Sequence, residues 1–547
     1  MIPFEINLFR KQFPLLNVMV HQQPLVYFDN GATTQKPEVV IDAEHAYYRL
    51  FNTNVHRASY QLAAETTAKF EQARKQVQQL INANSHREII WTKGCTESIN
   101  LVAQSWGRSQ LKKDDVIVLS YAEHHANIVP WQIIAQQTGA QIKVLPLTEQ
   151  GVIATEQLTD VICDRTRIVC ISHISNVIGK VNPIEKVIAR ARVVGAKTLI
   201  DGAQAIANLV VNVQKLDCDF YVFSSHKMYG PTGVGILYGK EHLLNDMPPY
   251  QSGGEMIKEV SFSGTSFESL PFKFEAGTPN ISGVIAFAKA IEFIHSYQLN
   301  NQHPYKQQLL EYTYQRLKTV PSLQFITKGQ PDVPIFSFTL KDNVQDVASE
   351  LDLYGVAVRV GRHCAMPLFE YLGIAGCIRI SLAPYNTFTE VDFVIDKLMA
   401  FVTKAPHEVE ELKPNIHSDI ELVDKFKKLK GWDTKHRELM LLGKQLSRMP
   451  KTQRNEESLI QGCESAAWLI YSQDNQQRYF FQTDSDAKII RGLLAVVLAA
   501  YNGKTSADIL TFNIDDYFSS LGLINHLSPS RGNGLLAIVK KIKTIVA

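Results

Sequence analysis

Short apolar runs alternate with stretches of helical periodicity between about residues 85 and 240. Several of these runs are β-branched and end in polar residues, which is typical of a mostly parallel sheet covered by helices on both faces. We predict strands at Glu88–Trp91, Asp115–Ser120, Gln141–Pro146, Arg167–Ser172, Thr198–Ile200, Asp219–Phe223 and Val234–Tyr238.

The pattern changes after about residue 265. Helical stretches at Gly283–Tyr297 and His303–Val320 precede apolar runs at Val333–Leu340 and Val356–Val360. A further helix is expected near Val391–Thr403. This order predicts a smaller α/β subdomain that completes a first domain over residues 1–405.

Residues 406–416 are charged, contain two prolines and lack an apolar stripe, which indicates a linker. Residues 417–547 then begin a new helical pattern and contain apolar positions for a core of their own. We therefore predict a second, separate domain over residues 417–547.

Composition narrows the possible functions. The 547 residues include 56 Lys and Arg against 54 Asp and Glu, a formal net charge of +2, and 45% are hydrophobic. This balance favours globular domains over disorder and gives no sign of nucleic-acid binding. The best apolar run, Leu493–Ala500, is too short to span a membrane and predicts a buried helix. The N-terminus lacks a secretory pattern, so we expect a cytoplasmic protein.

Seven cysteines are spread along the chain without a CxxC pair or a Cys/His cluster of zinc spacing. Neither a disulfide scaffold nor a metal site is therefore predicted. In a reducing compartment a single cysteine can instead be a nucleophile.

Four polar clusters, AEHHAN, SHISN, DGAQ and SSHK, each follow a predicted strand. Ligands of parallel sheets bind beyond the carboxyl ends of the strands, so these clusters are expected to converge. Lys227 can form a Schiff base if its pKa falls, and Asp201 can keep a pyridinium nitrogen protonated. Pyridoxal phosphate (PLP) needs this pairing to act as an electron sink.

Other residues of these clusters suit the rest of such a cofactor. Ser224, His226 and Thr96 can donate to a phosphate, and Thr96 lies in a strand-to-helix turn whose amides favour an anion. His124 can stack on the ring. Each cluster alone is more often an ordinary turn or a solvated pair, whereas the combination in this order favours a cofactor site.

The blocks IDGAQA, DCDFYVFSSHKMYGPTGVGILYG, EHHANIVPW and FEAGTPN resemble those of fold-type I, class V PLP enzymes. More narrowly, they resemble the cysteine desulfurases of the SufS/CsdA type over nearly all of residues 1–405. The resemblance implies an α/β fold with a large parallel-sheet domain and a small subdomain, in subunits that form a homodimer.

The resemblance also implies roles for single residues. Lys227 is the Schiff-base lysine, Asp201 pairs with the pyridine nitrogen, Gln204 bonds the ring hydroxyl and His124 stacks on the ring. The residues implied at the phosphate are Thr96, Ser224, His226 and, from the other subunit, Thr278.

The stretch RVGRHCAMP resembles the cysteine loop of the same desulfurases, with Cys364 as the nucleophile. A thiol needs a lowered pKa to react near neutrality, and Arg359, Arg362 and His363 are expected to supply positive charge. The commoner fate of a free cysteine, burial in a core, is disfavoured by these neighbours. The implied reaction converts L-cysteine to L-alanine and leaves a persulfide on Cys364, with His124 expected to donate or accept a proton during these steps.

Arg379, in CIRISLAPYNT, resembles the arginine that binds the substrate carboxylate, a group that a guanidinium suits in bidentate fashion. Asn176 and Arg359 are expected to assist it. The alternative for Arg379 is a surface charge, but its flanking isoleucines favour a buried strand.

Three positions depart from the family pattern. Cys95 stands where threonine is common, and a small change in phosphate packing is expected from it. Arg362 stands where the cysteine loop more commonly has a second histidine, and this difference is expected to alter the pKa of the thiolate or the docking of a partner. Asn208 and Leu209 lie where a related enzyme can carry a histidine pair.

Residues 417–547 resemble the SufE/CsdE-type sulfur acceptors, small α+β domains, through GWDTKHRELMLLGKQL, LIQGCESAAWL, DSDAKIIRGLLAVV and LSPSRGNGL. Cys463 matches the persulfide-accepting cysteine, with Arg531 and Asp484 or Asp486 near it. TDSDA departs from the more usual GDSDA. Tethering would give the two thiols a high effective concentration, in cis or across a dimer.

The sequence therefore predicts a cysteine desulfurase fused to its sulfur acceptor, which supplies iron–sulfur cluster assembly through a scaffold or another acceptor protein. A selenocysteine lyase, acting on L-selenocysteine, or another class V PLP enzyme is the first alternative. A non-enzymatic scaffold for sulfur delivery is the second, and the intact Lys227, Asp201, Cys364 and Arg379 argue against it.

Overall fold

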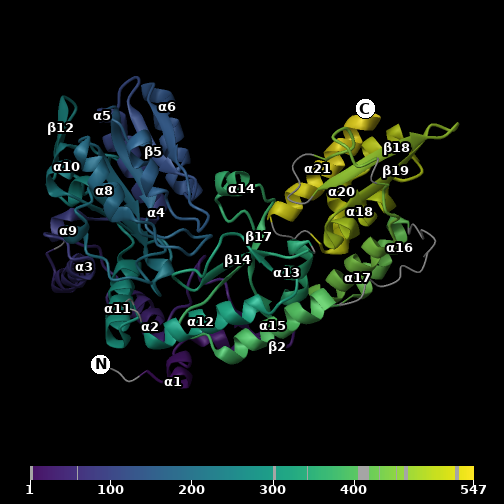
Figure 1. The fold of residues 1–547 in the computed structure, drawn as a ribbon, viewed down its shortest axis with the longest axis horizontal. Coiled ribbons are helices and arrows are strands. Elements are labelled where there is room, and N and C mark those ends of the chain that lie inside the picture. Colours follow the sequence, from purple (N-terminus) through teal and green to yellow (C-terminus); the bar gives the residue numbers. More distant parts are fainter. Residues whose placement is uncertain are drawn as a thin grey trace. The chain divides into compact units, whose positions relative to one another are not determined.

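The computed structural model describes most of the chain, in two compact units (Figure 1). Unit 1 comprises residues 1–340 and 354–399, and unit 2 comprises residues 341–353 and 400–547. The described residues are 4–57, 59–299, 303–341, 343–403, 418–429, 431–450, 453–460, 466–523 and 529–547. The predicted linker 406–416 lies outside them, so its boundaries stay a prediction.

A seven-stranded sheet forms the centre of unit 1, in the order β4-β10-β9-β8-β7-β5-β6. Only β10 runs antiparallel to its neighbours, so the predicted mostly parallel sheet is confirmed. All seven predicted strands belong to it, within two residues at each end. Their bounds are Ile89–Thr92 (β4), Val116–Ser120 (β5), Gln141–Leu145 (β6), Thr166–Ser172 (β7), Lys197–Asp201 (β8), Phe220–Ser224 (β9) and Gly235–Gly239 (β10).

Two apolar clusters cover the two faces of this sheet. Successive side chains of a strand point to opposite faces, and accordingly Ile89 and Trp91 join one cluster while Ile90 joins the other. The first cluster includes residues of α2 (Glu38–Leu50), α3 (Gln61–Leu80), α8 (Ile184–Val193) and α11 (Ile281–Tyr297). The second includes residues of α4 (Cys95–Val102), α6 (Val129–Thr138) and α10 (Glu241–Asp246).

A smaller antiparallel sheet has the order β13-β14-β17-β16. Its strands are Gln324–Phe325 (β13), Ile335–Thr339 (β14), Arg359–Gly361 (β16) and Cys377–Ser381 (β17). The helices in this part of the sequence are α12 (Pro304–Lys318), α13 (Val344–Asp352), α14 (Met366–Leu372) and α15 (Phe388–Thr403).

The apolar run Val356–Val360 is divided between two short strands. Val356–Ala357 (β15) pairs in parallel with Val26–Tyr27 (β3), and only β16 pairs with β17. The run is apolar apart from Arg359, but its two halves hydrogen-bond to different partners, and a sequence pattern does not encode that choice.

In unit 2, a three-stranded sheet is formed by β18 (Ala467–Gln473), β19 (Arg478–Ser485) and β20 (Lys504–Thr505). Its larger helices are α16 (Asp419–Lys428), α17 (Trp432–Gln445), α18 (Lys488–Tyr501), α20 (Ile514–Leu521) and α21 (Pro529–Val546). Most residues of α18 are buried in a separate apolar cluster, which confirms the buried helix predicted at Leu493–Ala500.

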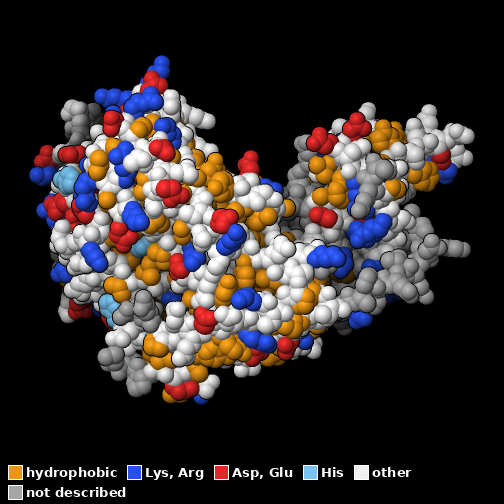
Figure 2. All heavy atoms as spheres, in the orientation of Figure 1, with side chains coloured by type: hydrophobic (Ala, Val, Ile, Leu, Met, Phe, Trp, Pro, Cys, Tyr) orange, Lys and Arg blue, Asp and Glu red, His pale blue; other side chains and the backbone are white. Residues whose placement is uncertain are grey.

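Among the described residues, no helix combines the length and apolarity that a bilayer crossing requires. On the face of unit 1 seen in Figure 2, basic and acidic side chains are interspersed. The shorter elements are α1 (Ile6–Arg10), β1 (Met19–Val20), β2 (Gln23–Pro24), α5 (Arg108–Gln110), α7 (Leu158–Val161), α9 (Val213–Leu216), β11 (Ile257–Ser261), β12 (Gly264–Phe267) and α19 (Ser506–Thr511).

Candidate active site

The carboxyl ends of the parallel strands surround a cavity of about 220 Å³. The polar clusters after β5, β7, β8 and β9 converge there, together with the start of α4 and residues of β16 and β17. The predicted site residues that line it are Thr96, His124, Asn176, Asp201, Gln204, Ser224, His226, Lys227, Arg359, Cys364 and Arg379. Thr278 does not line it and is exposed.

Asp201 and Lys227 occupy neighbouring strand ends of this cavity. Asp201 is buried and accepts a hydrogen bond from the backbone N–H of Ala203 at 2.9 Å. Lys227 ends the short turn after β9, and burial lowers its pKa while Asp201 opposes the shift. A lysine with a lowered pKa carries a neutral, nucleophilic amine more often than a solvated one does.

Cys95 lies against Asp201, which the sequence did not reveal. Its thiol is 3.3 Å from Asp201 Oδ1, while its backbone N–H donates to Ser224 Oγ at 2.8 Å. Burial raises the pKa of Cys95, so the group is a thiol that donates to the carboxylate. Cys95 therefore contacts the ring-nitrogen end of the expected cofactor site, in addition to the phosphate end where we had expected its effect.

The start of α4 forms the other end of the cavity. Gly94 is its N-cap, and a Cβ atom on Gly235 of β10 would lie 2.3 Å from the Gly94 Cα. This close approach requires glycine and brings Ser224 to the helix start. Burial lowers the pKa of His226 to about 4, so its imidazole is neutral at pH 7. Thr96 is exposed, and it also lines an adjoining cavity of about 650 Å³.

His124 is half-buried and follows β5. Its Nδ1 accepts from the backbone N–H of Ala126 at 3.1 Å, which leaves Nε2 as the protonated nitrogen. Burial, and then the charge of Lys227, lower its pKa to about 4. A neutral imidazole of this kind suits stacking and proton transfer.

Glu123, beside His124, was not recognised in the sequence. It is fully buried and accepts hydrogen bonds from the backbone of Ser172 at 3.0 Å and from Asn127 Nδ2 at 2.8 Å. Burial raises its pKa to about 7. Glu123 thus joins the ends of β5 and β7. It could not be singled out in the sequence, because it is one of several polar residues in AEHHAN.

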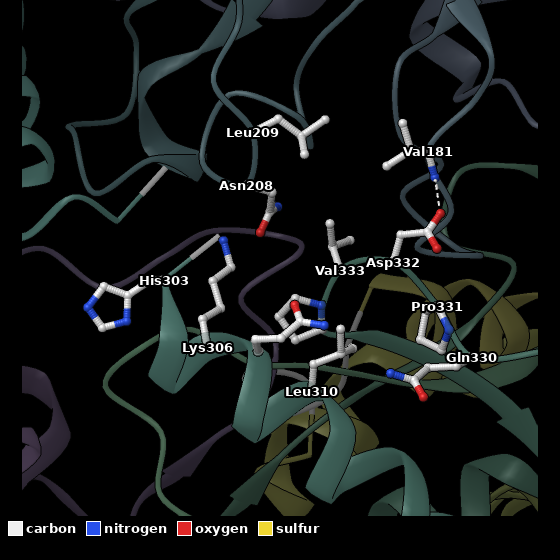
Figure 3. A pocket seen from close by; sticks show the side chains of 12 residues that line it. Val181, Asn208, Leu209, His303, Lys306, Leu310, Gln330, Pro331, Asp332 and Val333 are labelled. Atoms are coloured by element: carbon white, nitrogen blue, oxygen red, sulfur yellow. Dashed lines mark hydrogen bonds between the residues drawn. The ribbon is translucent and has the colours of Figure 1, made fainter. Parts of the chain in front are cut away.

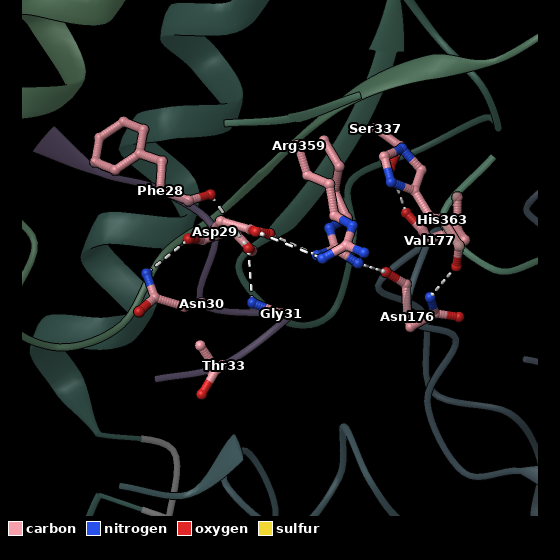
Figure 4. Close-up of polar contacts among 12 residues, drawn as sticks. Phe28, Asp29, Asn30, Gly31, Thr33, Asn176, Val177, Ser337, Arg359 and His363 are labelled. Carbon is pink, nitrogen blue, oxygen red and sulfur yellow. Dashed lines mark hydrogen bonds and ion pairs between the residues drawn. The ribbon is translucent and has the colours of Figure 1, made fainter. Parts of the chain in front are cut away.

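Arg379 lies on β17 with 2% of its surface exposed, as its isoleucine neighbours predicted. Figure 4 labels two of its neighbours, Asp29 and Asn176, together with Arg359. It donates to Asn176 O at 3.0 Å and forms an ion pair with Asp29 at 2.8 Å. Arg359 lies 3.6 Å from the other oxygen of Asp29. The sequence did not identify Asp29, since only the fold places residue 29 beside β17.

Cys364 is exposed and opens onto the same cavity. His363 and Cys364 both have left-handed backbone angles, with φ of 47° and 56°. The carbonyl of Cys364 accepts from the backbone of His125 at 2.7 Å, and that of His363 accepts from Asn176 Nδ2 at 2.9 Å. These bonds fix the position of the cysteine loop.

The charges around Cys364 differ in part from the expectation. His363 is buried with its Nε2 3.2 Å from Cys377 Sγ, and burial lowers its pKa to about 3. It is therefore neutral and supplies no positive charge, which corrects the prediction. Arg362 is exposed and donates to Ala375 O at 3.1 Å.

The donor set fits PLP. A buried acid, a lysine with a lowered pKa and a helix start with Ser224 and His226 line one cavity, and these groups suit a pyridine nitrogen, an aldehyde and a phosphate respectively. Gln204 currently donates to Gly31 O at 2.7 Å.

In unit 2, Asp484 is fully buried at the end of β19. It forms ion pairs with Arg454 at 2.8 Å and with Arg448 and Arg491 at 3.2 Å each. Asp486 is exposed.

Cys463 lies outside the described residues, and Arg531 lies in α21 with its side chain outside them. Ile460 and Ala467, which flank residues 461–465 in the sequence, are joined by a hydrogen bond from the Ile460 N–H to Ala467 O at 2.8 Å.

Residues 26–394 match the Aminotransferase class-V family, and residues 420–546 match the Fe-S metabolism associated domain (SufE). A cysteine desulfurase of Cronobacter sakazakii is 46% identical over 398 residues, which span 72% of this chain and 98% of that protein. One of Escherichia coli O9:H4 is 47% identical over 397 residues, again 72% of this chain and 98% of the relative.

Solved structures give the same picture. The cysteine desulfurase CsdA of Escherichia coli aligns with a TM-score of 0.68 and 40% identity, over 73% of this chain and 99% of its own. The cysteine desulfurase of Thermococcus onnurineus aligns with a TM-score of 0.70 and 33% identity, over 74% of this chain and all of its own.

Proposed function

From the premise that this chain belongs to the cysteine desulfurases of the class-V aminotransferase family, we propose that it converts L-cysteine to L-alanine through a Cys364 persulfide and passes the sulfur to Cys463. The SufE domain that follows in the sequence supports iron–sulfur metabolism as the destination of the sulfur. The observation that carries the proposal is that an exposed cysteine, a half-buried lysine and a buried arginine line one cavity.

The chain's own residues divide the work. Arg379 binds the substrate carboxylate, for which its guanidinium must exchange Asp29 for the substrate. Lys227 takes the proton from the substrate Cα, because burial lowers the pKa of its amine. PLP, when bound, supplies the electron sink for the pair released by that proton transfer. Asp201 would hold its ring nitrogen, and Ser224, His226 and Thr96 its phosphate.

Cys364 performs the sulfur transfer. Its thiolate attacks the substrate sulfur, and the bond between substrate Cβ and sulfur breaks. The electron pair of that bond stays with carbon, which is protonated as alanine forms. Cys364 is left as a persulfide with no external oxidant, since the carbon is reduced as the thiol sulfur is oxidised.

The second transfer moves the terminal sulfur to the Cys463 thiolate and regenerates Cys364. The two thiols belong to the same tethered assembly, so transfer within one chain or across the dimer replaces a free bimolecular encounter by a high effective concentration. An iron–sulfur scaffold or another acceptor protein would then take the sulfur from Cys463.

The test adds L-cysteine to the purified holoenzyme and locates persulfides by peptide mass spectrometry. We expect sulfur on Cys364 and Cys463 in the native chain, on Cys364 alone in Cys463→Ala, and on neither in Cys364→Ala. Cys163→Ala, which changes another partly accessible thiol of unit 1, is the control and should match the native chain. Sulfur on Cys463 in Cys364→Ala would contradict the relay.

We also propose a homodimer in which Thr278 serves the partner's phosphate site. Its exposure, and its position away from both cavities of its own chain, support this proposal. Light scattering should give twice the mass of one chain, and a monomeric mass with full PLP content would contradict it.

The preference for L-cysteine over L-selenocysteine is part of the proposal. Release of alanine from each substrate, measured at equal concentrations, tests it. Faster release from L-selenocysteine, without a lasting persulfide analogue on Cys364, would instead favour a selenocysteine lyase.

A further inference from the structure

A second cavity of unit 1, of about 350 Å³, shares no lining residue with the candidate active site. It lies where the turn after β8 meets the start of α12 and residues 330–334 (Figure 3). Its lining is half polar and half apolar. The apolar residues are Val181, Leu209, Leu310, Pro331, Val333 and Pro334.

Lys306, in the first turn of α12, is the unusual residue of this cavity. It is 9% exposed, and its ammonium donates to Ala207 O at 3.0 Å. Among the described residues no carboxylate forms an ion pair with it. A buried ammonium normally has such a partner, because desolvating an unpaired charge is expensive. Burial accordingly lowers the pKa of Lys306 to about 7.

The other groups of the cavity do not supply the missing negative charge. Asp332 is already neutralised, since it accepts from Lys180 Nζ at 3.0 Å and from the Val181 N–H at 2.9 Å. His303 is 8% exposed, and its Nδ1 has no hydrogen-bond partner within the part of the chain that the structure describes. His303 is the N-cap residue of α12, and its side chain forms no capping hydrogen bond to the described residues of the helix. The backbone N–H groups at this helix start therefore favour an anion.

We propose that this cavity binds a small organic carboxylate, with the carboxylate on Lys306 and its apolar part against the leucine and valine side chains. One uncompensated positive charge matches a monoanion, and the apolar wall matches a short hydrocarbon chain. The volume lies near the lower end of small-molecule pockets.

The position links this cavity to the catalytic one. Lys306 bonds Ala207, and Asn208 Nδ2 donates to Gln204 O at 2.7 Å. Gln204 lines the active-site cavity. A carboxylate on Lys306 therefore sits behind the turn that presents Gln204.

The experiment measures acetylation of single lysines in the holoenzyme by peptide mass spectrometry, with pentanoate as the probe. We expect pentanoate to protect Lys306, because it fills the cavity and keeps the ammonium protonated. Lys328, which is 71% exposed, is the internal control and should not change. Pentan-1-ol and inorganic phosphate, which carry only the chain or only the charge, should protect much less.

A variant provides the second readout. Pentanoate should raise the melting temperature of the native holoenzyme. The dissociation constant of pentanoate should be roughly tenfold or more higher for Lys306→Met, because this substitution removes a charge-assisted hydrogen bond. Alanine production by Lys306→Met reports on the catalytic site separately. The proposal is overturned if pentanoate leaves Lys306 reactivity unchanged, if phosphate or pentan-1-ol protects equally, or if Lys306→Met binds pentanoate like the native chain.

Discussion

The two units differ in what surrounds their desolvated charged groups. In unit 1, the buried Asp201 and Arg379 and the half-buried Lys227 line one cavity, so their charges face a space where a ligand can bind. In unit 2, the buried acid Asp484 forms ion pairs with three arginines, so its charge is compensated by side chains of the protein itself.

This difference separates a site that performs chemistry from a scaffold that supports a carrier. Desolvated groups around a cavity have shifted pKa values that a reaction can use. A carboxylate saturated with arginines fixes the chain around it. We therefore expect substitutions in unit 1 to change turnover, and substitution of Asp484 to change stability.

The largest expected effect is that of Lys227→Ala. Loss of the amine that takes the Cα proton should lower alanine production by roughly 1,000-fold or more. Lys328→Ala removes an exposed lysine and should retain full activity. The two variants should melt alike, and a Lys227→Ala enzyme with native turnover would contradict the assignment.

Asp484→Ala should act on stability instead. Arg491, whose side chain is 7% exposed, then loses the carboxylate of its ion pair. This loss should lower the free energy of unfolding of unit 2 by about 3 kcal/mol. Denaturant unfolding with hydrogen exchange in α18 measures it. Asp486→Asn, at an exposed residue, should stay within about 0.5 kcal/mol. If alanine production fell with Asp484→Ala before unit 2 unfolded, the contrast between the units would fail.

Asp29→Asn tests whether a carboxylate of the chain competes with the substrate for Arg379. The variant keeps the bond from Arg379 to Asn176 O but removes the negative charge, so KM for L-cysteine should fall roughly three- to tenfold with little change in kcat. Asp396→Asn, which changes a 72% exposed acid, is the control. A higher KM with a lower kcat would show that Asp29 positions the arginine.

A further prediction concerns pH. The pKa of His363 is about 3 in the fold and near 6.5 in an unfolded chain, so below pH 6.5 the unfolded state binds the extra proton. Stability is thus complete above pH 6.5 and is lost as pH falls, at up to about 1.4 kcal/mol per pH unit. His363→Asn should flatten this slope in melts between pH 6 and 4. An unchanged slope would show that His363 is not the group responsible.

Much of unit 1 was predictable, because buried parallel strands are continuous apolar runs and topology forces their polar ends together. The convergence of His124, Asn176, Asp201 and Lys227 follows from that rule. The contact of Cys95 with Asp201 does not, since it joins residues 106 positions apart.

In unit 2 the site residues came from family resemblance alone. No periodicity marks Asp484 as buried among arginines, because alternation along β19 does not tell which partners fill the space around it. The charge of Lys306 could likewise not be predicted as unpaired, since only the fold shows that none of the described acids forms an ion pair with it.

The central claim is that sulfur moves from Cys364 to Cys463. The most direct measurement follows one turnover of the holoenzyme with sulfur-34 L-cysteine, quenched at successive times and analysed by peptide mass spectrometry. The account predicts label first on Cys364 and then on Cys463, with the loss from one matching the gain of the other. Label that reaches Cys463 no later than Cys364, or that never leaves Cys364, would contradict it.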